Sequence, residues 1–181
     1  MRITVSGLPG SGTTSLSRYL AERHEFTMIS AGEVFRQLAK EHNMELAEFG
    51  ELAKKDASYD KMIDARQKEI ARERDNIIIE GRLSGWMVDE ADLRIWLYAP
   101  ISCRISRIVF RDQVSDTNTA EHLTLEREQC EADRYRSYYS IDIGDLSIYH
   151  LILNSGHWDV EGLGAIIDTA IERMKPGQTS E

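Results

Sequence analysis

The sequence has few of the features that mark secreted, metal-binding or membrane proteins. It holds two cysteines and three prolines in 181 residues, and Cys103 and Cys130 lack the CxxC spacing of a zinc site or a disulfide scaffold. The first five residues run directly into glycines and are too short for the apolar region of a signal peptide. No stretch approaches the length of a membrane span. These absences predict a cytoplasmic protein that has no membrane partner.

An excess of positive charge is also missing. The chain has 22 Lys and Arg against 31 Asp and Glu, which gives a formal net charge of −9. A surface of this sign repels a nucleic-acid backbone, so we expect small-molecule substrates and no nucleic acid as partner. With 41% hydrophobic residues and no long linker, the chain is expected to form one domain with inserted segments. We also expect it to act as a monomer.

Short apolar runs alternate with helical patterns along the chain. Such alternation is typical of an α/β fold with a parallel sheet, because the buried strands of such a sheet are apolar on both faces. The runs are rich in β-branched residues, and they cover Ile3–Ser6, Phe26–Ile29, Asn76–Glu80, Leu93–Tyr98 and Tyr149–Asn154. Ser30–Glu33 forms a capping box before one helix, and Asp159 is the expected cap of the last helix, up to Met174.

Two charged segments interrupt this alternation. Residues 43–74, between the second and third expected strands, and residues 111–139, between the fourth and fifth, keep a helical pattern and never alternate as a strand does. We interpret both segments as helical insertions on the α/β core.

The strongest local motif follows the first expected strand and opens a helix. It consists of Gly7, Leu8, Pro9, Gly10, Ser11, Gly12, Thr13, Thr14 and Ser15. Glycines in this position let backbone N–H groups turn toward phosphate oxygens, and the dipole of the helix favours the same anion. The motif matches G-x-x-x-x-G-K-[ST] except that Thr13 replaces the lysine. Thr14 keeps the hydroxyl expected on Mg²⁺. The alternatives are a turn that binds nothing and a loop that binds a nucleotide without catalysis.

Arginines downstream are candidates to replace the missing cation. Arg104, Arg107 and Arg111 stand at i, i+3 and i+7 and so share one face of a helix. Phosphoryl transfer requires positioning and charge neutralisation, which guanidinium groups at the base of a closing segment provide. The alternative is an ordinary solvated helix face.

A second group of charged residues falls in the 111–139 insertion. Arg127, Glu131, Arg134 and Tyr138 recur on one helix face, which favours a polar site. An ion pair within the helix, between Arg127 and Glu131, explains part of the same pattern, and both interpretations stay open.

The third expected strand ends in Glu80, followed by Gly81 and Arg82. A carboxylate at the carboxyl edge of a parallel strand lies beside the phosphate loop, where it can hold magnesium through water. Arg82 is then placed to bind the phosphate of an acceptor.

Taken in order, these blocks resemble the archaeal-type cytidylate kinases, a branch of the P-loop nucleoside monophosphate kinases. The resemblance extends over nearly the whole chain, and the blocks that carry it are residues 3–7, 29–36, 80–86 and 127–139. The resemblance implies a three-layer P-loop NTPase fold with strand order 2-3-1-4-5. It also implies a monophosphate-binding flap near residues 31–74, a lid near residues 111–139, and phosphorylation of CMP and dCMP by ATP with Mg²⁺.

The resemblance also implies roles for single residues. Residues 7–15 would hold the ATP phosphates, while Thr14 and Glu80 would hold the metal. Arg107, Arg111 and Arg134 would act on the transferring group. The acceptor would be bound by Arg36, Asp64, Arg82, Arg127 and Glu131, with Arg66 and Gln67 as further candidates beside Asp64 for reading the cytosine edge.

Thr13 departs from the general phosphate-loop pattern and leaves two rivals open. One is a kinase for another small acceptor, such as AMP, UMP or shikimate. The other is a regulatory protein that binds ATP but transfers nothing. The arginines in both insertions count against the second rival, because a simple sensor needs only the loop.

Overall fold

The computed structural model describes residues 1–44, 48–49, 52, 56 and 58–174. Within these residues one parallel sheet has the order β2-β3-β1-β4-β5, as the resemblance implied. The strands are β1 (Arg2–Gly7), β2 (Thr27–Ser30), β3 (Ile77–Glu80), β4 (Leu93–Tyr98) and β5 (Leu151–Asn154). The expected strands are therefore confirmed, with shifts of one or two residues at their ends.

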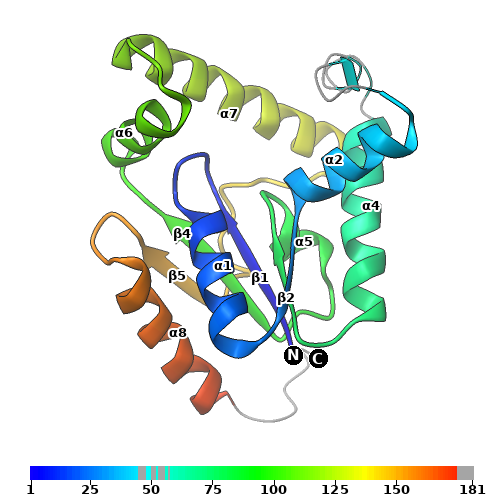
Figure 1. The fold of residues 1–181 in the computed structure, drawn as a ribbon, viewed down its shortest axis with the longest axis vertical. Coiled ribbons are helices and arrows are strands. Elements are labelled where there is room, and N and C mark those ends of the chain that lie inside the picture. The colour runs from blue at the N-terminus through cyan, green and yellow to red at the C-terminus, as the bar shows by residue number, and fades with distance from the viewer. Residues whose placement is uncertain (45–47, 50–51, 53–55, 57, 175–181) are drawn as a thin grey trace.

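Helices cover both faces of the sheet (Figure 1). Their bounds are α1 Thr13–His24, α2 Ala31–Glu41, α4 Ser58–Glu73, α5 Ser84–Met87, α6 Ile101–Asp112, α7 Thr117–Tyr139 and α8 Val160–Arg173. Helices α1 and α8 pack together on one face, while α4 and α5 lie on the other. The three-layer α/β prediction is confirmed. Among the described residues no helix is long and apolar enough to cross a membrane.

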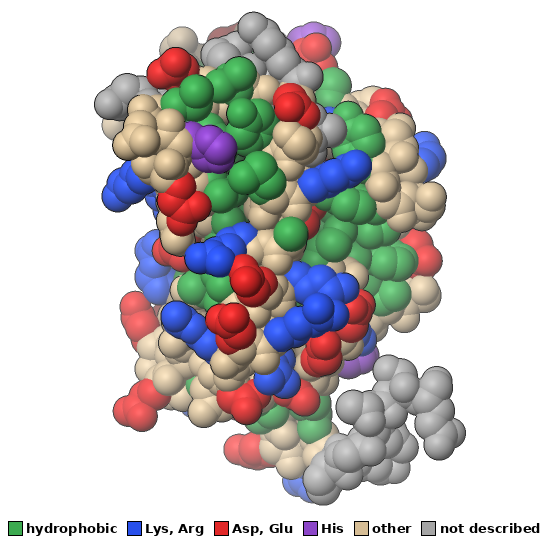
Figure 2. Space-filling view, turned by 90° about the vertical axis from the view of Figure 1, so that its right-hand side faces the viewer, with side chains coloured by type: hydrophobic (Ala, Val, Ile, Leu, Met, Phe, Trp, Pro, Cys, Tyr) green, Lys and Arg blue, Asp and Glu red, His purple; other side chains and the backbone are tan. Residues whose placement is uncertain are grey.

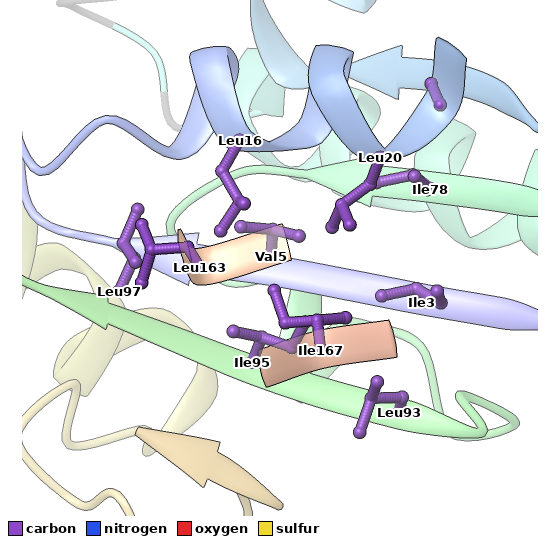
Figure 3. Close-up of a cluster of buried hydrophobic side chains, with 11 residues drawn as sticks. Ile3, Val5, Leu16, Leu20, Ile78, Leu93, Ile95, Leu97, Leu163 and Ile167 are labelled. Carbon is purple, nitrogen blue, oxygen red and sulfur yellow. The ribbon is translucent and has the colours of Figure 1, made fainter. Parts of the chain in front are cut away.

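The main core lies between the sheet and the pair α1 and α8. Alternate residues of β1, Ile3 and Val5, point to this face because side chains of a strand alternate in direction. They meet Leu20 of α1 and Ile167 of α8, and all four are fully buried (Figure 3). On the opposite face of β1, Ser6 Oγ lies 2.9 Å from Ser84 Oγ of α5. The core therefore fixes β1, and with it the start of the phosphate loop.

Ile167→Ala is expected to lower the free energy of unfolding by about 2–5 kcal/mol, because the change leaves a cavity in a packed core. Ile167 is 0% exposed, whereas Ile152 on β5 is 53% exposed and is the matched control. Ile152→Ala should change stability by less than about 0.5 kcal/mol. Urea unfolding followed by circular dichroism measures both, and equal effects would contradict this assignment of the core.

Both predicted helix caps are present. The Ser30 hydroxyl accepts from the backbone N–H of Glu33 at 3.1 Å, and the Glu33 carboxylate accepts from the Ser30 N–H at 3.2 Å. Asp159 accepts from the N–H of Gly162 at 2.8 Å and caps α8. Since α2 and α8 follow strands directly, these caps place two helix N-termini at the carboxyl edge of the sheet.

The predicted insertions are mainly helical among the residues that the structure describes. The first, residues 43–74, contains α4, while residues 45–47, 50–51, 53–55 and 57 of that segment lie outside the described part of the chain. The second contains α7, which runs above the carboxyl ends of the strands from α6 toward α4 (Figure 1). At its far end the Tyr139 hydroxyl donates to Asp64 of α4 at 2.6 Å.

The face formed by α4 carries charges of both signs. Arg66 pairs with Glu69, Lys68 with Asp89, and Arg72 with Glu90, all as exposed or partly exposed ion pairs. Figure 2, which looks onto this side, shows basic and acidic side chains interspersed. Exposed pairs of this kind contribute little to stability, so their main effect is to balance the surface charge.

Candidate nucleotide-binding site

A cavity of about 1230 Å³ opens at the carboxyl edge of the sheet. This edge is where ligands bind in open α/β folds. The cavity is lined by the phosphate loop, the start of α2, part of α4, residues 80–83, α6, α7 and the segment after β5. One cavity thus contains both the phosphate loop and the segments expected to bind an acceptor.

The phosphate loop, Gly7–Ser15, joins β1 to α1. Gly10 and Gly12 have φ of 80° and 92°, in the left-handed region that favours glycine. A Cβ on Gly10 would lie 2.6 Å from the carbonyl oxygen of Arg104, so a side chain there is also excluded by space. Gly12 is the N-cap of α1, whose N-terminus faces the cavity. Backbone N–H groups and a helix dipole directed into one cavity fit a polyphosphate.

Thr13, which stands where the general motif has lysine, forms a side-chain hydrogen bond with Glu80. Its hydroxyl donates to Oε1 of Glu80 at 2.7 Å, and both side chains are buried, at 7% and 9% exposure. Glu80 ends β3 and pairs in register with Val5 of β1, which brings the carboxylate beside the loop. Thr13 therefore orients the carboxylate that was predicted to bind metal. Thr14, the next residue, is exposed and lines the cavity.

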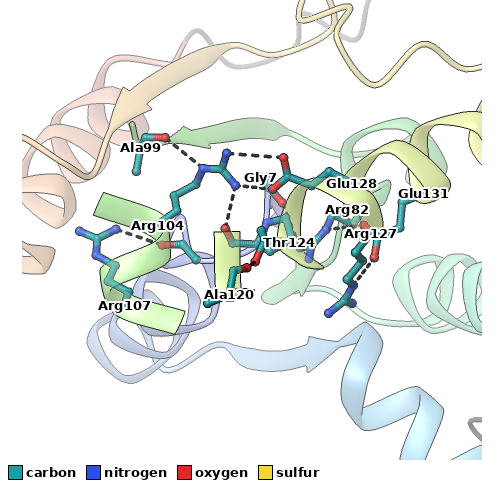
Figure 4. A network of polar contacts seen from close by, with 12 residues as sticks. Gly7, Arg82, Ala99, Arg104, Arg107, Ala120, Thr124, Arg127, Glu128 and Glu131 are labelled. Carbon is teal, nitrogen blue, oxygen red and sulfur yellow. Dashed lines mark hydrogen bonds and ion pairs between the residues drawn. The ribbon is translucent and has the colours of Figure 1, made fainter. Parts of the chain in front are cut away.

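The three arginines of the predicted stripe occupy three different environments. Arg107 donates to the carbonyl oxygens of Gly10 and Ser11, each at 3.3 Å, and to the carbonyl oxygen of Ser155 at 2.6 Å. Arg104 is 6% exposed and faces α7 (Figure 4). The solvated-face alternative is therefore wrong for these two residues.

Arg111 remains at the mouth of the cavity. Its guanidinium pairs with the neighbouring Asp112 at 2.6 Å, and its side chain is 66% exposed. The hydrogen bond raises the pKa of Arg111 and lowers that of Asp112. Because an exposed ion pair is weak, a polyphosphate entering the cavity can replace Asp112 as the partner of Arg111.

Glu131 of α7 joins two arginines from different parts of the chain. Its carboxylate accepts from Arg82 Nε at 3.0 Å and from Arg127 Nε at 2.7 Å, and the residue is 6% exposed (Figure 4). Burial by itself raises the pKa of Glu131, but the charges and hydrogen bonds of the two arginines hold the pKa below its ordinary value. The predicted ion pair between Arg127 and Glu131 is therefore confirmed, and both residues also line the cavity, so the pair does not exclude the interpretation as a polar site.

Arg82 also connects this pair to the phosphate loop. Its Nη1 donates to the carbonyl oxygen of Gly7 at 3.1 Å. A single guanidinium therefore contacts the loop expected to hold the donor and the carboxylate expected to lie on the acceptor side.

The cavity is also lined by most of the other predicted residues. Arg36, Asp64, Gln67 and Arg134 all line it. Gln67 is 2% exposed and donates to the carbonyl oxygen of Glu80 at 3.1 Å. Arg66, a further candidate for reading the base, is not among the lining residues, because its position on α4 turns it outward to Glu69.

Of the four residues predicted to share one face of α7, Tyr138 does not line the cavity. Tyr138 is 40% exposed and has Lys61 Nζ 5.4 Å from its ring centroid, outside the lining. Tyr135, which was not among the predicted residues, lines the cavity instead. Helical spacing predicts which residues share a face, but it does not predict where the neighbouring surface ends.

Sequence reasoning also missed residues after β5. Ser155 is 6% exposed, and its hydroxyl donates to the Ser11 carbonyl oxygen at 2.5 Å. Trp158 is 49% exposed and lines the cavity together with Phe110, which is 87% exposed. The position of Trp158 directly before the predicted cap Asp159 is a sequence signal that could have placed it, because a helix that follows a strand of a parallel sheet starts at the edge where ligands bind.

The strand order, the phosphate loop after β1 and the arginines that converge on one cavity define the fold and site of a P-loop kinase. The chain belongs to the cytidylate kinase-like family, whose family model matches residues 2–157. It is 75% identical to a cytidylate kinase of Methanoregula boonei over 175 residues, covering 97% of this chain and 96% of that protein. A cytidylate kinase of Methanosphaerula palustris is 62% identical over 97% of this chain and 99% of its own length.

Solved structures support the fold at much lower sequence identity. A shikimate kinase from Bacteroides thetaiotaomicron superposes with a TM-score of 0.65 at 15% identity, covering 95% of this chain and 98% of the other. An uncharacterised protein from Eubacterium ventriosum gives a TM-score of 0.72 at 18% identity, covering 96% of this chain and 99% of that chain. At such identities the likeness concerns the fold alone.

Proposed function

We propose that this protein transfers the terminal phosphoryl group of ATP to CMP, and also to dCMP, forming the diphosphate and ADP. Full-length relatives named cytidylate kinase support this activity. The observation that carries the proposal is the position of Arg82, which contacts the Gly7 carbonyl oxygen and the buried Glu131 in one cavity. A cation between two anion sites is what a kinase with two phosphorylated substrates requires.

On the donor side, Gly7–Ser15 hold the ATP phosphates through backbone N–H groups. Arg107 is already fixed against the loop by its contacts with Gly10, Ser11 and Ser155. Arg111 and Arg134 lie on the cavity wall and complete the positive charge around the transferring group. Fixed guanidinium groups stabilise the negative charge of the transition state without further reorganisation.

A magnesium ion fits the donor side by the chemistry of its residues. The Thr14 hydroxyl and the Glu80 carboxylate are the oxygen ligands that Mg²⁺ prefers, and Thr13 holds one Glu80 oxygen while the other is left for metal-bound water. Few protein ligands are needed, because Mg²⁺ in kinases keeps several waters and phosphate oxygens. When bound, the ion neutralises charge on the phosphates.

On the acceptor side, Arg36, Arg82 and Arg127 bind the phosphate of CMP. Glu131 keeps two of these arginines in place, and Asp64 on the flap faces the base. In this proposal residues 31–74 act as the monophosphate-binding flap and residues 111–139 as the lid, within one domain that acts as a monomer.

The reaction is a direct in-line transfer. An oxygen of the CMP phosphate forms a bond to the γ-phosphorus of ATP as the bond to the β,γ-bridging oxygen breaks and ADP leaves. The attacking oxygen is already an anion at neutral pH, so no strong general base is required. The protein aligns the two phosphates, neutralises charge and excludes water, which would otherwise compete as the acceptor.

The two rivals have less support. The relatives named above carry the name cytidylate kinase, and the resemblance to shikimate kinase concerns the fold alone. A purely regulatory role has no need for arginines that reach from the loop to a second anion site, such as Arg82.

An acceptor panel tests the proposal. Steady-state assays with MgATP and CMP, dCMP, UMP or AMP should give kcat/KM for the two cytidine nucleotides at least about tenfold above the other two, because a base is read by paired polar groups. Omission of magnesium should abolish turnover in each case. Equal rates with all four acceptors would contradict the cytidine preference, and ATP binding without any transfer would favour the regulatory rival.

A further inference from the structure

A buried ion pair lies behind the cavity, between α6 and α7. Arg104 donates through Nη1 to Glu128, a pair whose side chains are 7% and 13% exposed, and through Nε to the Ala99 carbonyl oxygen at 3.2 Å. Neither Arg104 nor Glu128 lines the cavity, so neither is placed to touch a nucleotide. Apolar packing between these helices is already supplied by Ile105, Ile108 and Ala120. Packing between α6 and α7 therefore does not by itself explain why a charged pair is present there.

The same guanidinium reaches the phosphate loop. Arg104 Nη1 also donates to the carbonyl oxygen of Pro9 at 3.1 Å. The backbone of Gly10 packs against the backbone of Arg104. A Cβ added to Gly10 would lie only 2.6 Å from the Arg104 carbonyl oxygen. The middle of the phosphate loop therefore packs against the first turn of α6. A shift of the loop backbone would change the contacts of Arg104.

Glu128 transmits this contact to the acceptor side. It stands three residues before Glu131 on α7, so the two carboxylates project from neighbouring positions of one helix. Glu131 holds Arg82, which returns to the loop at the Gly7 carbonyl oxygen (Figure 4). Helix α7 is therefore attached to the phosphate loop at two points, through Arg104 at Pro9 and through Arg82 at Gly7.

We propose that Arg104 is a positioning residue that couples ATP binding in the phosphate loop to the position of α7, and so to the arginines that bind the acceptor. Arginine suits this role because its planar group donates in several fixed directions at once, whereas the single ammonium of lysine cannot serve Ala99, Pro9 and Glu128 together. The inference rests on the proposed donor and acceptor sites. It adds that their binding is cooperative and that Arg104 and Glu128 transmit the effect.

The test is a linkage measurement by titration calorimetry. The Kd of CMP is measured without and with a saturating non-hydrolysable MgATP analogue, for the wild type, Arg104→Lys, Glu128→Gln and the double variant. The wild-type ratio of the two Kd values should be about fivefold or more, within the usual range of coupling between sites. In each single variant the ratio of the two Kd values should fall below about twofold. The double variant should have the same ratio as the single variants, because both residues act through one contact. The reciprocal titration of the analogue must give the same ratios.

Glu90→Gln provides the matched control. Glu90 pairs with Arg72 on the surface, away from the cavity, and its loss should leave the ratio unchanged. Thermal unfolding of each variant separates loss of fold from loss of coupling, and Glu128→Gln keeps the size of the side chain should Arg104→Lys fail to fold. Folded variants with the wild-type ratio would overturn the proposal and leave Arg104 with a structural role only, as would a wild-type ratio near one. A wild type that binds neither nucleotide would contradict the proposed function itself.

Discussion

Arg82→Ala is expected to lower kcat/KM for CMP by about 10²–10³-fold, the usual effect of removing one preorganised donor from a reacting anion. Arg82 contacts Gly7 on the donor side and Glu131 on the acceptor side. Its loss removes a proposed phosphate ligand and also leaves the buried Glu131 with Arg127 as its cation partner among the described residues. Since the charge is needed most while the phosphoryl group moves, kcat should fall more than the affinity for ATP.

Two variants make this result interpretable. Arg82→Lys keeps the charge but not the two-pronged geometry, so its kcat/KM should lie between those of the wild type and Arg82→Ala. Arg72→Ala removes an exposed arginine that pairs with Glu90 outside the cavity, and its activity should match the wild type. A loss of less than about threefold in Arg82→Ala would remove Arg82 from the reaction, because so small a factor is below the effect of one donor.

Thr13→Lys should reduce kcat by about a hundredfold rather than improve it, although it restores the general phosphate-loop pattern. The Thr13 hydroxyl lies 2.7 Å from Glu80 in a buried site, so a lysine ammonium would form an ion pair with the same carboxylate. That pair would neutralise the group proposed to hold magnesium, whose contribution to catalysis is several kcal/mol. Arg107 already places positive charge beside the loop.

Thr13→Ser and Thr13→Val serve as controls for the hydroxyl. Serine keeps the donor to Glu80 and should retain activity close to that of the wild type. Valine keeps the shape but removes the donor, which leaves the buried carboxylate unsatisfied at a cost of about 1–3 kcal/mol in stability. Steady-state kinetics as a function of magnesium concentration, together with urea unfolding, distinguish the three variants. A large gain in Thr13→Lys would mean that the natural loop is impaired and that the arginines do not replace the lysine.

In the proposed site the main chain and the arginines have different tasks. The backbone of the loop supplies direction, since Gly10 and Gly12 adopt conformations that other residues avoid. Arginines line the cavity from three places, α6, α7 and the segment after β3, and in the proposed mechanism they share the task of the missing lysine. In this proposal the arrangement becomes complete only when α7 and the proposed flap are correctly placed, so the contacts of α7 are expected to affect catalysis.

Sequence alone determined the elements whose causes are local. The apolar runs predicted the five strands, the Ser30 and Asp159 caps predicted two helix starts, and the glycines after β1 predicted the phosphate loop. Each of these depends on residues within a few positions of one another, where backbone geometry and side-chain period restrict the outcome. The order of the blocks was enough to indicate the family.

Tertiary structure decided which partners those elements meet. Thr13 and Glu80 are 67 residues apart, and Arg82 and Glu131 are 49 apart, so no local pattern could pair them. The spacing of Arg104, Arg107 and Arg111 places them on one helix face, but their side chains have different surroundings. Arg104 contacts Glu128 of α7, Arg107 contacts the phosphate loop, and Arg111 is exposed to solvent. Helical period defines the direction of a side chain from its own axis, whereas its partner depends on how distant segments pack against that face.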